Sequence, residues 1–258
     1  MASSYRSFWD DTGEHFPSLK GAASTRYYFA CERQLMETFF PPLAGRRLLK
    51  TDLWDEAKNT EILRWAAGQG ATPIGIDIAE PTVRQARAAF NGAPLLCAAA
   101  DVRTIPLVDN SVDLIYSMGT IEHFPDYAAA AREMFRVLRP GGTALIGVPN
   151  KLDPFLRPAL VSMMRAVGRY PYGMEKSFTA RQLRRLLESA GFAPVGRSGV
   201  LFLPGWLRML DLLFHTRRSP LAGVTAALVR PFAWMYRRFP AVRAHGYLLA
   251  IAATKPAW

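Results

Sequence analysis

The 258-residue sequence contains only two cysteines, Cys31 and Cys97, too few for a disulfide framework or a zinc cluster. The first residues, MASSYRSFWDD, lack the apolar core of a secretory signal. The longest uncharged apolar stretch near the C-terminus, residues 198–207, is too short to span a bilayer. From these absences we expect a cytoplasmic protein in a reducing compartment.

Acidic residues are scarce in the C-terminal part. Residues 1–153 carry 16 Lys and Arg against 18 Asp and Glu, whereas residues 154–258 carry 16 basic residues against three acids. The net charge of +11 therefore comes from the second part of the chain. Such a basic region predicts an anionic partner, which could be a lipid surface, a nucleic acid or an acidic substrate. We do not expect nucleic acid, because no recognised binding module accompanies the charge.

Half of the residues are apolar and 21% are charged, a composition that excludes a disordered chain. From residue 46 onward, short β-type runs alternate with segments of helical periodicity. This alternation is typical of a parallel sheet with crossover helices. We expect strands at residues 47–51, 72–78, 94–98, 112–117, 143–148, 192–203 and 247–254, and helices at 25–40, 56–67, 81–90, 127–138 and 177–190.

Two segments lie outside this alternation. Residues 1–44 are predicted to form an N-terminal helical arm, which could cover a cofactor as a lid or simply pack on the sheet. Residues 204–244 form an apolar, arginine-rich insertion within a domain made of residues 45–203 and 245–258. We expect two or three short helices there, interrupted at Pro220, Pro231 and Pro240. Such helices suit a cap over an acceptor site, a lipid-like acceptor, or contact with an anionic membrane surface.

Polar residues follow three of the predicted strands, at the edge where open parallel sheets bind ligands. Asp77 could accept both hydroxyls of a ribose, or could only cap the next helix. Asp101 could accept from an adenine amine, or could be a solvated turn residue. Gly119 and His123 follow the fourth predicted strand, where a substrate would be met. His123 could equally be a satisfied residue at a helix start.

The runs ADVRTIPLVDNSVDLIYSMGTIEHFPD, EMFRVLRPGGTALIGVPN and KSFTARQLRRLLESAGFAPV resemble class I S-adenosylmethionine-dependent methyltransferases, specifically the small "type 11" methyltransferase domain. The resemblance covers residues 45–200 and the last predicted strand. It implies an α/β, Rossmann-like, seven-stranded mixed sheet whose last strand is antiparallel, with S-adenosylmethionine bound across the strand ends. Carried onto this sequence, it places Asp77 at the ribose and Ile78 against adenine, Asp101 at the adenine amine and Val102 beside the ring, and Ser117 and Met118 beside the methionine portion.

The first motif departs from that family. Its usual acid and glycine-rich loop are replaced by the glycine-free LLKTDLWDEA, with Lys50 at the position of the acid and Trp54 at a glycine position. In one interpretation the loop, Thr51 included, still binds the cofactor. The ammonium group of the cofactor would then pair with Asp52 or Asp55, and the carboxylate of the cofactor with Lys50 or Arg26. In the other, the loop closes the cleft and the protein binds a ligand or catalyses different chemistry. We favour retained binding, because Asp77 and Asp101 remain.

If the cofactor binds, we expect methyl transfer to a small or lipid-like acceptor, with O-methylation favoured and C- or N-methylation possible. His123 is the predicted base, since imidazole titrates near neutral pH, and Glu122 is the alternative. Gly119, Tyr27 and Tyr28 are predicted to border the substrate. No metal site is expected, and the sequence leaves the oligomeric state open.

Overall fold

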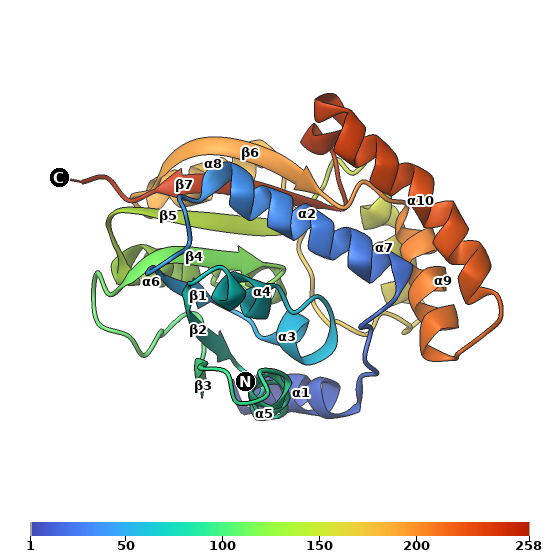
Figure 1. Cartoon of the computed structure of the whole chain (residues 1–258), viewed down its shortest axis with the longest axis horizontal. Helices are drawn as coiled ribbons and strands as arrows, with labels where there is room; N and C mark the ends of the chain where they lie inside the picture. The colour runs from blue at the N-terminus through green and yellow to red at the C-terminus, as the bar shows by residue number, and fades with distance from the viewer. Residues whose placement is uncertain (1, 258) are drawn as a thin grey trace.

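The fold is built on one seven-stranded sheet with strand order β3-β2-β1-β4-β5-β7-β6 (Figure 1). We describe it from a computed structural model covering residues 2–257, with side chains from residue 5 onward. Neighbouring strands are parallel except for β7, which is antiparallel to both β5 and β6. The mixed sheet implied by the resemblance is therefore confirmed. The strands are β1 (Arg47–Lys50), β2 (Thr72–Asp77), β3 (Leu96–Ala99), β4 (Val112–Met118), β5 (Leu138–Pro149), β6 (Ala193–Val200) and β7 (Leu248–Thr254).

Helices cover both faces of the sheet, and the sheet divides the core into two apolar clusters. Helices α2, α4, α5 and α10 contribute to one cluster, and α6 and α8 contribute to the other. In Figure 1, α2 runs across the near face of the sheet, and α7, α9 and α10 gather at one end. The helices are α1 (Ala2–His15), α2 (Ala23–Phe39), α3 (Trp54–Lys58), α4 (Ile62–Gly68), α5 (Glu80–Ala89), α6 (Tyr127–Val137), α7 (Arg157–Ala166), α8 (Ala180–Ser189), α9 (Gly205–Thr216) and α10 (Ala222–Arg238), with short 3₁₀ turns η1 (Ile121–His123) and η2 (Pro240–Ala244).

The single helix predicted over residues 56–67 is wrong: the segment forms two short helices, α3 and α4. Helix α3 ends at Lys58, and Glu61, in a left-handed backbone conformation with φ of 61°, precedes the first residue of α4. The buried carboxylate of Glu56 accepts a hydrogen bond from Leu63 N at 2.7 Å, near the start of α4. This bend gives residues 51–58 a fixed path at the end of β1.

The insertion also differs from its prediction. Pro231 lies inside the 17-residue helix α10 and does not end it, whereas Pro220 precedes that helix and Pro240 begins η2. Helix α7, in a segment for which no element was predicted, packs near α9. No helix within residues 2–257 is long and apolar enough to cross a membrane.

A buried carboxylate fastens the insertion to the N-terminal arm. Asp211 of α9 accepts a hydrogen bond from Ser24 N, at the start of α2, at 2.7 Å. Its other oxygen accepts from the hydroxyl of Thr225, in α10, at 3.0 Å. One side chain therefore holds three helices together.

Replacing Asp211 with alanine should lower the free energy of unfolding by about 2–4 kcal/mol, because two buried donors lose a charged acceptor. Urea denaturation followed by circular dichroism measures the change. Glu188→Ala is the control, since that residue pairs with Arg184 on an exposed helix face and should matter by less than about 1 kcal/mol. Equal losses for both variants would contradict the fastening role of Asp211.

Candidate active site

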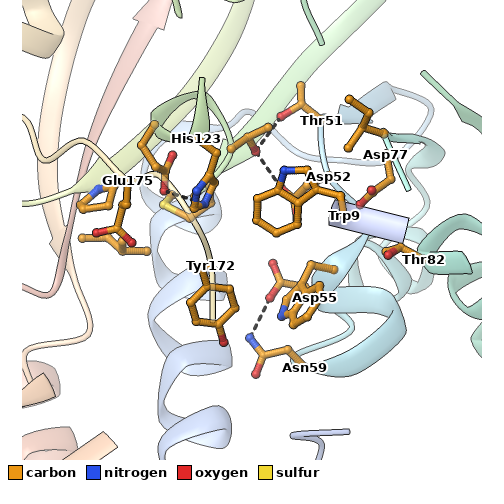
Figure 2. A pocket seen from close by; sticks show the side chains of 18 of the residues that line it. Trp9, Thr51, Asp52, Asp55, Asn59, Asp77, Thr82, His123, Tyr172 and Glu175 are labelled. Atoms are coloured by element: carbon orange, nitrogen blue, oxygen red, sulfur yellow. Dashed lines mark hydrogen bonds and ion pairs between the residues drawn. The ribbon is translucent and has the colours of Figure 1, made fainter. Parts of the chain in front are cut away.

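A large cavity opens at the carboxyl ends of β1 to β4. It holds 1240 Å³ of empty space, part of it open to solvent. The sheet supplies one wall, and the N-terminal arm, the segment 170–175 and helix α9 supply the others. Figure 2 shows Trp9, Asp55, Asp77, His123 and Tyr172 placed around this space.

Asp77 closes the cavity at the end of β2. One carboxylate oxygen accepts from Leu53 N at 2.8 Å, and the other accepts from Ala79 N at 2.8 Å. Burial raises the pKa of Asp77 to about 7, although these two backbone bonds act in the opposite direction. The side chain therefore ties the first loop to the start of α5 while it lines the cavity.

The glycine-free loop after β1 is accommodated by a glycine elsewhere. Leu53 is fully buried and packs directly over Gly75 of β2. A Cβ atom at position 75 would lie 2.4 Å from Leu53 Cδ2, so any larger residue there would collide with the loop. The side chain of Leu53 thus fills the space above β2, and it can approach the backbone of that strand closely because residue 75 is a glycine.

Lys50 is fully buried at the end of β1 and anchors the same loop from below. Its Nζ lies 2.9 Å from Asp52 Oδ1, 3.0 Å from Asp55 Oδ2 and 3.5 Å from Glu56 Oε2. Burial favours the neutral amine, but these carboxylates outweigh it and raise the pKa of Lys50. Burial likewise raises the pKa of Glu56, to about 7. Lys50 is therefore a cation buried beneath the loop. Two of its acidic partners, Asp52 and Asp55, line the cavity.

Asp101, after β3, is held in place by Arg103. Its carboxylate accepts from Arg103 N at 2.8 Å and from Arg103 Nε at 2.9 Å. Partial burial opposes ionisation, but these bonds prevail and lower the pKa of Asp101. The guanidinium of Arg103 in turn lies over the rings of Phe124, at 4.8 Å, and Tyr5 of α1, at 5.6 Å. The N-terminal arm therefore reaches this edge of the cavity.

His123 and Glu122 come from the short turn η1 after β4. Because a carbonyl can only accept, the 2.8 Å bond between His123 Nδ1 and Met174 O places the proton of the neutral ring on Nδ1. Nε2 is then an acceptor, 3.8 Å from Glu122 Oε1. Burial lowers the pKa of His123 and raises the pKa of Glu122, so both groups favour their neutral forms. The ring of Trp9 meets the imidazole edge-on at 4.9 Å.

The wall opposite the sheet was not predicted from the sequence. Arg157 forms a buried ion pair with Glu175, with 2.7 Å between Nη2 and Oε2, and its guanidinium stacks 4.1 Å from the ring of Tyr247. Residues 151–176 carry no recognisable motif, so no sequence signal singled them out. Among the residues that line the cavity and were not predicted as site residues are Trp54, Asn59, Thr82, Thr120, Arg157, Tyr170, Tyr172, Glu175, Arg208 and Tyr247.

The structure brings most of the predicted site residues to this cavity. Those that line it are Tyr28, Thr51, Asp52, Asp55, Asp77, Ile78, Asp101, Val102, Met118, Gly119, Glu122 and His123. Their individual roles stay predictions.

Four predicted residues do not line the cavity. Lys50 and Ser117 are fully buried within β1 and β4. Tyr27 points to the other side of α2, where it donates to Phe202 O at 3.3 Å and packs against Tyr236. Arg26, the alternative partner for a cofactor carboxylate, is exposed and donates to Gly21 O. We therefore remove these residues from the candidate ligand contacts.

Comparison with known proteins identifies the class. Residues 58–146 match the family model described as "Methyltransferase domain". A protein of Mycolicibacterium smegmatis, named a probable S-adenosylmethionine-dependent methyltransferase, is 30% identical over 73% of this chain and 67% of its own length. The 27-O-demethylrifamycin SV methyltransferase of Amycolatopsis mediterranei is 25% identical over 98% of this chain and 89% of its own. A Mesorhizobium loti methyltransferase structure shares the fold, with a TM-score of 0.60, 19% identity, and coverage of 92% of this chain and 100% of that one.

The fold and the cavity together define a class I, Rossmann-like methyltransferase. The chain belongs to the S-adenosylmethionine-dependent methyltransferases and is an enzyme whose cofactor is S-adenosylmethionine. The residues present fit that group. Its sulfonium and amino groups are cationic, and Asp52, Asp55, Asp77 and Asp101 all line the cavity.

The raised pKa of Asp77 predicts that cofactor binding depends on pH. If its carboxylate accepts the ribose hydroxyls, S-adenosylhomocysteine should bind more tightly at pH 8 than at pH 6, because the acid is protonated below about pH 7. Asp77→Asn should weaken binding at pH 8 and reduce the pH dependence. Titration calorimetry at both pH values measures this, and thermal melting confirms that the variant is folded. A variant with unchanged affinity and the same pH dependence would remove Asp77 from the site.

Proposed function

We propose that the enzyme transfers a methyl group to a hydroxyl of its acceptor, with His123 as the general base. The observation that carries this proposal is the orientation of the imidazole. Nδ1 is anchored on Met174 O, which leaves the unprotonated Nε2 as the acceptor in a wall of the cavity. Because burial lowers the pKa of His123, the ring is neutral at pH 7 and ready to take a proton.

In this arrangement the cofactor lies across the ends of β1 to β4. Asp77 receives the ribose and Asp101 the adenine amine, while Asp52 or Asp55 pairs with the ammonium group. Ile78 and Val102 flank the adenine, and Thr51 and Met118 border the methionine portion. Lys50 takes no direct part: its ion pairs hold Asp52 and Asp55 in place from below.

The bound cofactor supplies a methyl group activated by a positively charged sulfur. His123 Nε2 would accept the hydroxyl proton of the acceptor, whose oxygen would take the methyl group from the sulfur. The protein contributes mainly alignment and exclusion of water, to which Trp9 and Tyr172 contribute by covering the cavity. Glu122 is the alternative base, although burial raises its pKa and favours the protonated form.

Named relatives support an oxygen acceptor in this proposal. One is the rifamycin-pathway enzyme above, and another is a ubiquinone biosynthesis O-methyltransferase from Methylobacterium that is 26% identical over 68% of this chain. Carbon or nitrogen acceptors remain alternatives. The aromatic and aliphatic lining of the cavity suits a small or lipid-like acceptor.

His123→Asn should lower kcat/KM for hydroxyl acceptors by about 10²–10⁴-fold, because the base for the transferred proton is lost. The affinity for S-adenosylhomocysteine should stay unchanged. The measurement is release of S-adenosylhomocysteine with a panel of phenols and hydroxylated lipids, and His15→Asn on the exposed end of α1 is the control. Full activity of the His123 variant would overturn the assignment. Absence of cofactor binding by the wild-type protein would favour the non-methylating alternative.

We further propose that the insertion contacts an anionic membrane surface. Helices α9 and α10 expose large apolar side chains, among them Trp206 at 53% and Trp234 at 54%. Arginines are interspersed with them, and Asp211, the one acid of the insertion, is buried. Exposed apolar and basic residues without exposed acids are typical of helices that lie on anionic lipid.

The protein should co-sediment with phosphatidylserine-containing vesicles and less with pure phosphatidylcholine vesicles, since both the arginines and the apolar side chains contribute to binding. Trp206→Ala combined with Trp234→Ala should reduce co-sedimentation several-fold. Leu96→Ala is the matched control, because Leu96 is 64% exposed on β3, away from the insertion. Equal sedimentation with both vesicle types, or an equal effect of both variants, would refute this contact.

A further inference from the structure

A second hollow adjoins the cavity between α7 and α9. Its own lining is mainly apolar, and it shares part of its wall with the larger cavity. The shared residues are Leu19, Arg157, Tyr170, Tyr172, Arg208 and Tyr247. Among the apolar side chains found only in the second hollow are Phe16, Leu160, Val161, Met164, Leu212 and Leu213. We call this second hollow the α7–α9 groove.

Arg208 stands at the junction with its charge unmatched. Its Nη1 atom is buried and has no hydrogen-bond partner among the described residues. Its guanidinium lies over two aromatic rings, 5.1 Å from the centre of Tyr28 and 5.6 Å from that of Tyr247. Stacking of this kind leaves the edge of the planar guanidinium available for hydrogen bonds.

Arg157, unlike Arg208, has a carboxylate partner in the described part of the chain. Arg157 also borders both hollows, but Glu175 neutralises it through two oxygens. Asp211, the other acid nearby in sequence, is engaged by Ser24 N and Thr225 Oγ1. Arg208 is only partly buried, and its guanidinium, which has no carboxylate partner among the described residues, has donors left for the oxyanion of a ligand.

We propose that the junction binds an anionic amphiphile, with its oxyanion on Arg208 and its apolar chain in the α7–α9 groove. The oxyanion is a carboxylate or a phosphate, because both groups offer two oxygens that can accept hydrogen bonds from one guanidinium. This inference rests on the proposed function, in which the reacting hydroxyl of the same molecule lies in the larger cavity beside His123. It makes the acceptor an acidic molecule with a long apolar part.

The test uses calorimetric titration of the full-length protein, with and without S-adenosylhomocysteine, at probe concentrations below micelle formation. Dodecanoate and dodecyl phosphate should bind, and the stronger of the two identifies the preferred oxyanion. Dodecanol and butanoate should bind at least ten-fold more weakly, because each lacks one of the two features that the site recognises.

Variants separate the two parts of the site. Arg208→Met should weaken binding of the anionic probes at least ten-fold while leaving affinity for dodecanol and S-adenosylhomocysteine unchanged. Arg217→Met, an exposed arginine that follows α9, is the matched control for general attraction by positive charge. Leu212→Trp should weaken dodecanoate binding by filling the groove. Thermal melting reports whether each variant folds. Arg208→Lys is the conservative comparison, because it keeps the positive charge.

The result would overturn the proposal if neither anionic probe bound, or if Arg208→Met and Arg217→Met had equal effects. Loss of S-adenosylhomocysteine affinity in Arg208→Met would also overturn it, because Arg208 would then belong to the cofactor half. Failure of the proposed function gives a different result. The His123→Asn variant would keep full activity on hydroxyl acceptors, while calorimetric titration would still decide whether the amphiphile binds at Arg208.

Discussion

The cofactor edge of this enzyme depends on one buried cation. Lys50 lies beneath the loop after β1, within 3.5 Å of carboxylates on Asp52, Asp55 and Glu56. An isolated charge would be expensive to bury here, and the contacts of these three carboxylates with Lys50 fix the path of the loop. In relatives of the usual pattern, glycines let the backbone approach the cofactor. Here the ion pairs of Lys50 fix the conformation of the loop at the same edge of the sheet.

The rest of the cavity is assembled from parts that lie outside the sheet. Helix α1 brings Trp9 against His123, and α9 brings Arg208 over Tyr28 of α2. Asp211 holds the insertion to the arm, so these two segments form one continuous cover. The sheet therefore presents the reactive edge, while the arm and the insertion shape the space in which an acceptor is recognised.

The sequence allowed the sheet and the polar residues at its strand ends to be predicted, because each depends on local patterns. Asp77, Asp101 and His123 each follow a strand, and parallel strands bring their ends to one edge. The break between α3 and α4, with Glu61 in a left-handed conformation before α4, escaped prediction. Arg157, Glu175 and Arg208 escaped it because no motif marks them and only the tertiary fold brings them to the cavity. Tyr27 and Tyr28 are adjacent, and only the packing of α2 decides which of them faces the cavity.

The contact between Leu53 and Gly75 has a consequence for substitutions at either position. Leucine at position 53 requires the absence of a side chain at 75, and its removal would leave an empty space above β2. Neither position can change independently without a collision or a void. The two residues therefore form an epistatic pair. The effects on stability of substitutions at positions 53 and 75 should therefore not be additive.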